Sequence, residues 1–321
     1  MIMPINYGYA CINMQLSQPV LFGGKPKKTE PITTNRTMIK STFERRGIKY
    51  ASELALQNVK DLYKILVWNK QNFIYFYRLS SDIFPWASEY QFEQLPDHDE
   101  IVDWMTKVGQ YANANHIRLT SHPGPFNKLA SSDERVIRQT VRDLEIHGWV
   151  QDKLLMPRTP WSKINIHVGA TYGNKAKAAE TFCRNFELLS DAVKTRLTVE
   201  NDDKPSLFST GDLHEMVSSK INIPIVFDYH HHSLHNGGLD EKEALQMAAS
   251  TWGRIKPVVH YSESRSIEQN NPKIKPQAHS DYVNTLPNNH DVLYDCMIEA
   301  KMKELALLRA VRVHRGLTTA A

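Results

Sequence analysis

The chain has 321 residues, a formal net charge of +4 and a hydrophobic fraction of 41%. It is long enough to bury a large core, and no apolar run approaches the roughly 20 residues that cross a bilayer, which excludes a membrane-spanning protein. No basic segment followed by an apolar one opens the chain, and its three cysteines are widely spaced. We therefore expect an intracellular protein that is neither secreted nor held by disulfides.

Eight short segments rich in β-branched and aromatic residues predict eight buried strands. They are 6–13, 73–80, 117–123, 163–169, 196–202, 224–230, 257–263 and 292–301. Most are separated by segments with the apolar spacing of helices, which are 51–70, 99–115, 133–150, 175–194, 211–220 and 240–251. This alternation predicts an α/β fold, a single (β/α)8 TIM-type barrel. An open doubly wound sheet is the alternative, but no G-x-G-x-x-G turn follows the first strand.

The whole chain, 1–321, is expected to form one barrel domain. The stretches 14–50 and 263–290 are expected to be elaborated loops at the carboxyl face of the strands, where barrels build their sites, and 306–321 a C-terminal tail. The first of these loops holds a basic cluster: Lys25, Lys27, Lys28, Arg36, Lys40, Arg45, Arg46 and Lys49. The cluster is either a solvated loop or a lip that contacts phosphate groups.

The last six predicted strands each end in an imidazole or a carboxylate. The residues are His122, His167, Glu200, Asp228, His260 and Glu299. A single such histidine is usually structural, but burying six ionisable groups at one barrel mouth is costly unless bound cations pair with them. Imidazole and carboxylate ligands without thiolate suit manganese, zinc or iron. The sequence therefore predicts a divalent-metal centre at the carboxyl face.

Glu200 is central in the strand order and is the candidate to bridge two ions. With Glu200, His122 and His167 would hold the first ion. The second ion would be held by Glu200 together with Asp228, His260 and Glu299. Two ions about 4 Å apart activate water and stabilise the leaving oxygen in phosphodiester hydrolysis, which gives the three carboxylates a catalytic role.

The histidine-rich segment 227–235 offers further ligands. His231 could reach a third ion together with His279, and Asp281 is a further candidate. The remaining histidines are expected to be loop residues or to support the ligands. They are His230, His232 and His235.

Ten motifs, in order, resemble those of the UV damage endonuclease family, DNA repair nucleases related to endonuclease IV. They are "GYACIN" (8–13), "TTNRT" (33–37), "SSDIFPWAS" (80–88), "SHPG" (121–124), "IHVGATYGNKAKA" (166–178), "VEND" (199–202), "FDYHHHSLH" (227–235), "HYSES" (260–264), "AHSDY" (278–282) and "IEAKMKE" (298–304). The resemblance implies a TIM-type barrel with the ligand set above, two or three metal ions, usually manganese, and nicking of double-stranded DNA immediately 5′ to a UV photoproduct.

The resemblance also implies that Tyr9 and Asn13 approach the lesion or the cleaved strand. Arg36 of the basic cluster is a further candidate for contact with DNA, and Pro125 and Phe126 are expected to form an apolar wedge at the lesion. The last two stand where relatives carry a glutamine–tyrosine pair that probes the duplex.

Two further departures from the family pattern concern the metal site. Glu89 replaces a histidine that would neighbour the metals. Val258 replaces a lysine, carboxylated in some relatives, and this changes the charge of the cluster.

Two other hypotheses stay open at this point. A sugar-phosphate isomerase or epimerase can use the same fold with two metals. A lesion-binding protein that has lost catalysis is compatible with the changes at Glu89 and Val258. The "TTNRT", "HPG" and "AHSDY" motifs and the basic segment favour DNA as the partner. No oligomer interface or membrane-binding segment is visible, so we expect a monomer.

Overall fold

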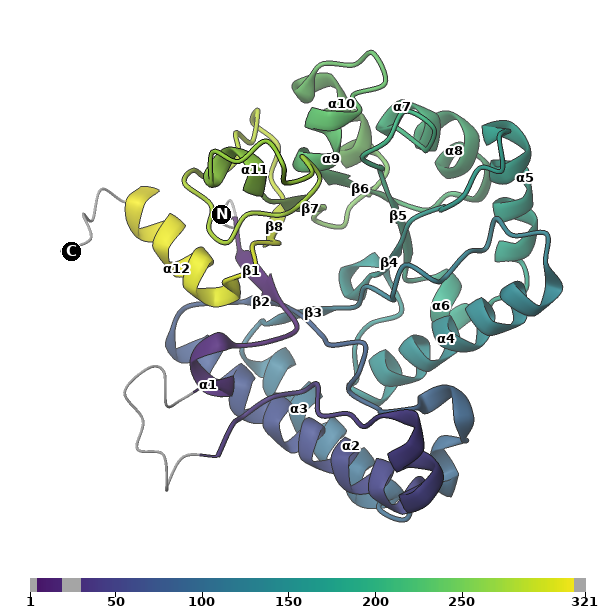
Figure 1. The fold of residues 1–321 in the computed structure, drawn as a ribbon, viewed down its shortest axis with the longest axis vertical. Helices are drawn as coiled ribbons and strands as arrows, with labels where there is room; N and C mark the ends of the chain where they lie inside the picture. The colour runs from purple at the N-terminus through teal and green to yellow at the C-terminus, as the bar shows by residue number, and fades with distance from the viewer. Residues whose placement is uncertain (1–4, 19–29, 315–321) are drawn as a thin grey trace.

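The computed structural model describes residues 5–18 and 30–314, and these form a barrel of eight parallel strands surrounded by helices (Figure 1). The strands are β1 (Tyr7–Ala10), β2 (Phe76–Arg78), β3 (Arg118–Thr120), β4 (Ile164–Ile166), β5 (Leu197–Glu200), β6 (Ile225–Asp228), β7 (Val258–Tyr261) and β8 (Asp295–Ile298). They run in the order β3-β2-β1-β8-β7-β6-β5-β4, and a parallel bridge between Ser121 and Ile164 joins the two ends. The predicted TIM-type barrel is confirmed, with a strand inside each of the eight predicted segments.

The helices form the outer ring. They are α1 (Met14–Ser17), α2 (Lys40–Gln71), α3 (His98–Ala114), α4 (Glu134–Lys153), α5 (Lys175–Phe186), α6 (Asp191–Lys194), α7 (Thr210–Leu213), α8 (Ser219–Ile221), α9 (Tyr229–Leu234), α10 (Glu241–Ser250), α11 (Arg265–Glu268) and α12 (Lys303–His314). Short 3-10 turns are η1 (Ala87–Glu89), η2 (Phe92–Gln94) and η3 (Pro160–Ser162), and η4 (His214–Ser218) is a π-helical turn. No helix among the described residues is both long and apolar enough to cross a membrane.

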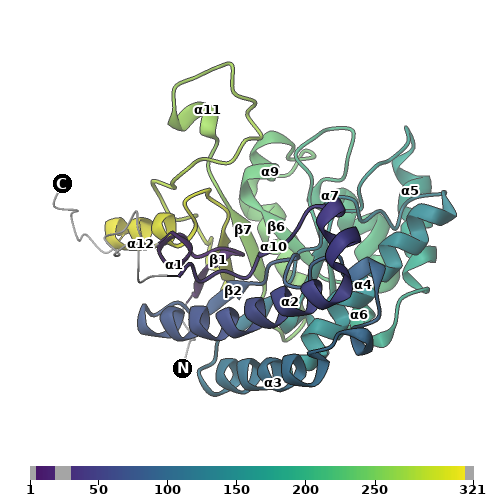
Figure 2. The same ribbon diagram turned by 60° about the horizontal axis from the view of Figure 1, so that its bottom comes forward.

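Several boundaries differ from the prediction. Helix α2 begins at Lys40, well before residue 51, although Gly47 interrupts it with a φ of 66°. The predicted helix 175–194 is divided into α5 and α6. The 263–290 loop contains α11 and projects above the barrel in Figure 2.

The C-terminal tail expected over 306–321 is helical as far as His314, and residues 315–321 lie outside the described part. Helix α12 buries Ala306, Leu307 and Ala310. At its start the buried carboxylate of Glu304 accepts hydrogen bonds from the N–H groups of Met14 and Gln15, both at 2.8 Å. The helix therefore anchors the segment that follows β1.

Side chains alternate along each strand, so every second residue enters the barrel. Near the amino ends of the strands, Arg118 and Asp295 form a fully buried ion pair at 3.0 Å. An apolar cluster that includes Phe76, Val226 and Val258 fills the interior beside them. The residues at or just beyond the carboxyl ends form the candidate site.

Candidate metal centre

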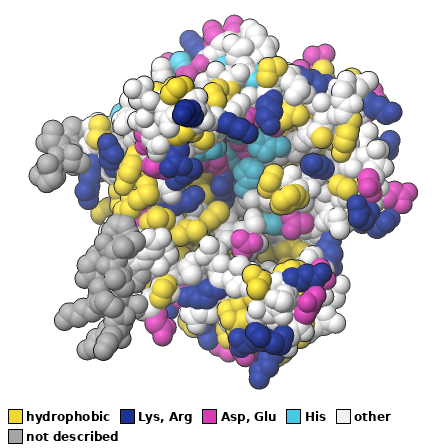
Figure 3. Space-filling view, in the orientation of Figure 1, with side chains coloured by type: hydrophobic (Ala, Val, Ile, Leu, Met, Phe, Trp, Pro, Cys, Tyr) yellow, Lys and Arg dark blue, Asp and Glu magenta, His cyan; other side chains and the backbone are white. Residues whose placement is uncertain are grey.

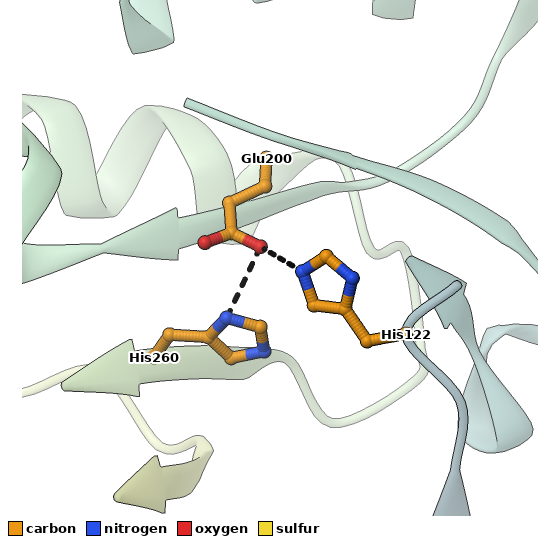
Figure 4. A group of neighbouring side chains, drawn as sticks. All are labelled: His122, Glu200 and His260. Atoms are coloured by element: carbon orange, nitrogen blue, oxygen red, sulfur yellow. Dashed lines mark hydrogen bonds and ion pairs between the residues drawn. The ribbon is translucent and has the colours of Figure 1, made fainter. Parts of the chain in front are cut away.

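Glu200, the last residue of β5, lies at the centre of the site and is almost fully buried. Its Oε2 lies 3.1 Å from His122 Nε2 and 3.1 Å from His260 Nδ1, as Figure 4 shows. The same oxygen is 3.9 Å from His167 Nε2 and accepts a hydrogen bond from Asn165 Nδ2. One carboxylate thus faces imidazoles from three other strands or their ends.

The second side of the site is formed by Asp228 and Glu299. Glu299 follows β8, and its Oε1 lies 3.3 Å from His260 Nδ1. Asp228 ends β6, and its Oδ1 accepts the N–H of His231 at 2.8 Å, which caps α9. Its Oδ2 is buried and has no hydrogen-bond partner among the described residues. An unpaired buried carboxylate oxygen is the type of atom that a cation stabilises.

The ligand atoms form three overlapping groups, each with its atoms within 4.8 Å of one another. The groups are His122 with Glu200 and His260, His167 with Glu200 and His231, and Asp228 with His260 and Glu299. All six residues predicted from the strand ends therefore come together with His231. Glu200 and His260 each belong to two groups, so the cluster has the donor types and the spacing that could hold divalent cations.

The charges in the cluster shift the pKa values of its members. Burial lowers the pKa of His122 to about 4, so its imidazole is neutral at pH 7 and free to bind a metal. Burial also disfavours the charged form of His167, but Glu200 and Asp202 outweigh it and raise that pKa to about 10. Burial raises the pKa of Asp228 to about 6. For Glu200, burial is outweighed by the histidines His260 and His167, which hold the carboxyl pKa well below its usual range.

The third predicted group is only partly assembled. His231 and His279 line the same pocket, with ring centres 6.3 Å apart, and His279 Nδ1 lies 4.0 Å from Glu299 Oε2. Asp281 points instead to Arg265, at 3.6 Å, so it does not join them.

The histidines left unassigned by the sequence lie around this group. The His230 ring is 5.6 Å from that of His279, and the His232 ring packs 5.1 Å from Phe227. His235 follows the last residue of α9 as its C-terminal cap. A supporting role for these three histidines stays a prediction.

Three charged residues that the sequence analysis did not single out also belong to the site. Arg78, the last residue of β2, forms an ion pair with Glu299. Asp202 Oδ1 lies 3.0 Å from His167 Nδ1. Lys163, fully buried, places its Nζ 3.2 Å from His260 Nε2. Lys163 lies four residues before His167, so the two-residue period of strands would have predicted that it faces the barrel interior.

Tyr9 and Asn13, expected to contact the lesion, are absent from the lining of the site pocket. Both are fully buried. Tyr9 lies on the outer face of β1, where its hydroxyl donates to Asn69 Oδ1 at 2.7 Å and accepts from Asn13 Nδ2 at 2.9 Å. Asn13 Oδ1 also caps α1 by accepting the N–H of Leu16. Their polar groups hold β1 against α2.

Arg36 also has a structural position. Its guanidinium lies 2.7 Å from the buried Asp61 and donates to the carbonyls of Pro31 and Thr33. It therefore fixes the 31–36 segment to α2 and is not free for a phosphate. Lys25, Lys27 and Lys28 of the same basic cluster lie outside the described residues.

The two family departures, Glu89 and Val258, lie in different parts of the structure. Glu89 is exposed on η1 and is absent from the lining of the site pocket, so it is not a neighbour of the ligands. Val258 is fully buried in the apolar cluster of the barrel interior. Neither position removes a predicted ligand.

The site opens through a pocket of about 520 Å³. Its lining includes Pro125 and Lys204, and Phe126 projects beside it with 87% of its side chain exposed. Figure 3 shows histidines gathered in the hollow on this face, with Lys and Arg side chains around it. The rim is thus more basic than the carboxylate-rich centre.

The fold and the ligand cluster define a (β/α)8 barrel with a candidate multinuclear metal centre at the carboxyl face of its strands. A family model described as "UV-endonuclease UvdE" matches residues 5–319, and the chain belongs to this family.

Individual relatives agree with this assignment. The chain is 36% identical to the UV-damage endonuclease of Schizosaccharomyces pombe over 95% of this chain and 50% of that protein. It is 32% identical to the UV DNA damage endonuclease of Clostridium perfringens, over 88% of this chain and 68% of that protein. It spans about half the length of the first of these relatives.

Solved structures show the same fold. The crystal structure of SacUVDE superposes with a TM-score of 0.80 and 29% identity, covering 98% of this chain and 99% of that one. A D-tagatose 3-epimerase-like protein, at 11% identity and a TM-score of 0.51, covers 76% of this chain and 88% of that one and shares the fold alone.

Proposed function

We propose that this chain is a metal-dependent DNA repair endonuclease that nicks duplex DNA 5′ to UV photoproducts. The observation that carries the proposal is the cluster of seven ligand-type residues, with Glu200 at its centre, in a member of the UV-endonuclease family. We further propose that it acts as a monomer in the compartment that holds the DNA.

The proposed cofactors are two or three divalent ions, manganese first, with zinc or iron as alternatives. The donor set is imidazole and carboxylate only, which these metals share. When bound, such ions act as Lewis acids that lower the pKa of water and stabilise a leaving alkoxide oxygen.

The chain's own residues would position the reaction. Glu200 would fix the spacing of adjacent ions, while Asp228 and Glu299 hold the opposite side of the centre. Asp202 would orient the His167 ring through its Nδ1, as carboxylates commonly do for ligating histidines. Arg78 would keep Glu299 in place and bring positive charge to the mouth where a phosphate must enter.

The lesion would be recognised from the β3–α4 loop. Phe126 is exposed beside the pocket and follows Pro125, whose ring stiffens the turn. A photoproduct already weakens base stacking, so an apolar side chain can enter the duplex there at a lower cost than at an intact step.

The experiment that tests the proposal uses irradiated and intact supercoiled plasmid with the purified protein and Mn²⁺. The protein is expected to nick the irradiated plasmid and to leave the intact plasmid uncut. It is also expected to carry at least one equivalent of bound metal after metal-supplemented expression. Nicking of neither plasmid by metal-loaded protein would show that the proposed activity is wrong.

The two alternatives have less support. The likeness to an epimerase-like barrel concerns the fold, which hosts many unrelated reactions. A binding protein without catalysis was suggested by Glu89 and Val258, but the ligand-type residues predicted from the strand ends are all present in the cluster.

A further inference from the structure

Tyr172, in the β4–α5 loop, combines two features that do not help the chain to fold. Its side chain is 65% exposed, and its φ is 49°, in the left-handed region that non-glycine residues adopt at an energetic cost. Gly173 follows with a φ of 79°, and the N–H of Asn174 donates to the carbonyl of Thr171 at 2.8 Å. This is a turn with two positive φ values, for which Asn-Gly is the preferred central pair.

Both ends of the turn are fixed to the barrel. The buried hydroxyl of Thr171 donates to the carbonyl of Ser206, in the loop after β5, at 3.0 Å. Asn174 caps α5 by accepting the N–H of Lys177 at 3.0 Å. The ring of Tyr172 is therefore presented to solvent by a rigid turn and not by a loose loop.

The turn lies on the rim of the candidate metal centre. It starts four residues after His167, a member of that centre. A Cβ placed on Gly169 would contact Lys128, so the Tyr172 loop runs beside the β3–α4 loop that carries Phe126. Two neighbouring loops of one rim thus each present an exposed aromatic ring.

We propose that Tyr172 is a second lesion-reading residue, whose ring stacks on a base that the photoproduct leaves unstacked. This inference rests on the proposed endonuclease function, because it takes damaged duplex DNA as the partner. Base–aromatic stacking is favourable for any base, which suits an enzyme that reads loss of stacking and not sequence. The strained turn is retained because it holds the ring in place before DNA binds.

The test compares Tyr172→Asn and Tyr172→Phe with the wild-type protein. Affinity for a short irradiated duplex and its intact counterpart is measured by fluorescence anisotropy in EDTA, so that no cleavage accompanies binding. Tyr172→Asn should lower the affinity for the irradiated duplex about tenfold. It should change the affinity for the intact duplex less than about twofold. Its Tm should not fall, since asparagine suits the turn better. Tyr172→Phe should keep the wild-type affinity, because it keeps the ring.

Phe73 provides the matched control. It is 79% exposed with a φ of 59°, but it follows α2 at the opposite, amino-terminal end of the barrel. Phe73→Asn should leave both affinities unchanged. Equal affinities of Tyr172→Asn and wild type, in a protein that nicks irradiated plasmid, would overturn this inference alone. An equal loss in Tyr172→Phe would also overturn it, since the hydroxyl would then be the contact. Failure of the wild type to prefer irradiated DNA would instead overturn the proposed function.

Discussion

Glu200 and His260 belong to β5 and β7, which are not adjacent in the sheet, yet Glu200 Oε2 and His260 Nδ1 lie 3.1 Å apart. The strand between them, β6, contributes Asp228, which pairs in register with His260. The curvature of the closed barrel turns these side chains toward one axis. The candidate centre therefore depends on the whole barrel and not on any one loop.

Glu200→Gln should lower nicking of irradiated plasmid at least about 100-fold, because an amide is a poor bridging ligand and the spacing of two ions depends on this group. Binding of irradiated duplex should remain detectable, since Glu200 is buried and the substitution leaves the surface of the protein unchanged. Glu134→Gln, an exposed position on α4, is the control and should behave as wild type. Wild-type nicking rates in Glu200→Gln would remove Glu200 from the centre.

Metal uptake should release protons and weaken as the pH falls. In the metal-free protein Glu200 and Asp202 outweigh the effect of burial on His167 and raise its pKa to about 10, so a metal must displace a proton there at pH 7. Burial raises the pKa of Asp228 to about 6, so a second proton competes below that pH. Mn²⁺ affinity should fall about tenfold per pH unit between pH 8 and 7, and more steeply below pH 6.

Isothermal titration of Mn²⁺ in two buffers of different ionisation enthalpy measures this release. Close to one proton per protein is expected at pH 8 from His167. A constant Mn²⁺ affinity between pH 8 and 5.5 would show that the metal displaces no proton from His167 or Asp228.

Arg118→Ala should destabilise the fold by about 3–5 kcal/mol, because it leaves the buried carboxylate of Asp295 with one partner fewer inside the barrel. The guanidinium also donates to the carbonyl of Trp161 at 2.7 Å. Urea unfolding measures the free energy. The matched control is Arg138→Ala, which breaks an exposed pair with Glu134 and should cost less than about 1 kcal/mol. Similar losses in the two variants would contradict a structural role for the buried pair.

The strand ends were predictable from sequence because parallel strands all deliver their last residues to one face. His122, His167 and Glu200 needed only that rule and the residue types that bind metals. The same reasoning gives the direction of the Tyr9 side chain, which the sequence analysis did not consider. Gly8 and Ala10 lie on the alternate face of β1, so Tyr9 must point outward, toward the helices.

Other features need tertiary contacts that a sequence does not display. Arg36 carries the same charge whether it faces a phosphate or Asp61, and only the packing of 31–36 on α2 decides between them. Helix α12 was missed although Ala306, Leu307 and Ala310 have helical spacing. Its role depends on Glu304, whose contact with the segment after β1 spans almost the whole chain.

Phe126→Ala should lower the preference for irradiated over intact duplex about tenfold while leaving the protein stable. The side chain is 87% exposed, so its removal costs little packing, and the Tm and metal content should match the wild type. The loop around it is held without the ring, because Asn127 donates to the carbonyl of Gly124 at 3.0 Å and to Asp143 at 2.7 Å. Loss of discrimination in Phe126→Ala could then be attributed to the missing wedge and not to a disordered loop.

Competition binding with irradiated and intact duplexes measures the preference. Because Phe126 would stack on one base, its removal should lower the ratio of the two affinities about tenfold. Phe73→Ala is the control, since it removes an equally exposed ring from the opposite end of the barrel. A marked drop in Tm with discrimination unchanged would show that Phe126 stabilises the loop. The same loss of discrimination in Phe73→Ala would show that exposed aromatic area, and not the position beside His122, determines the preference.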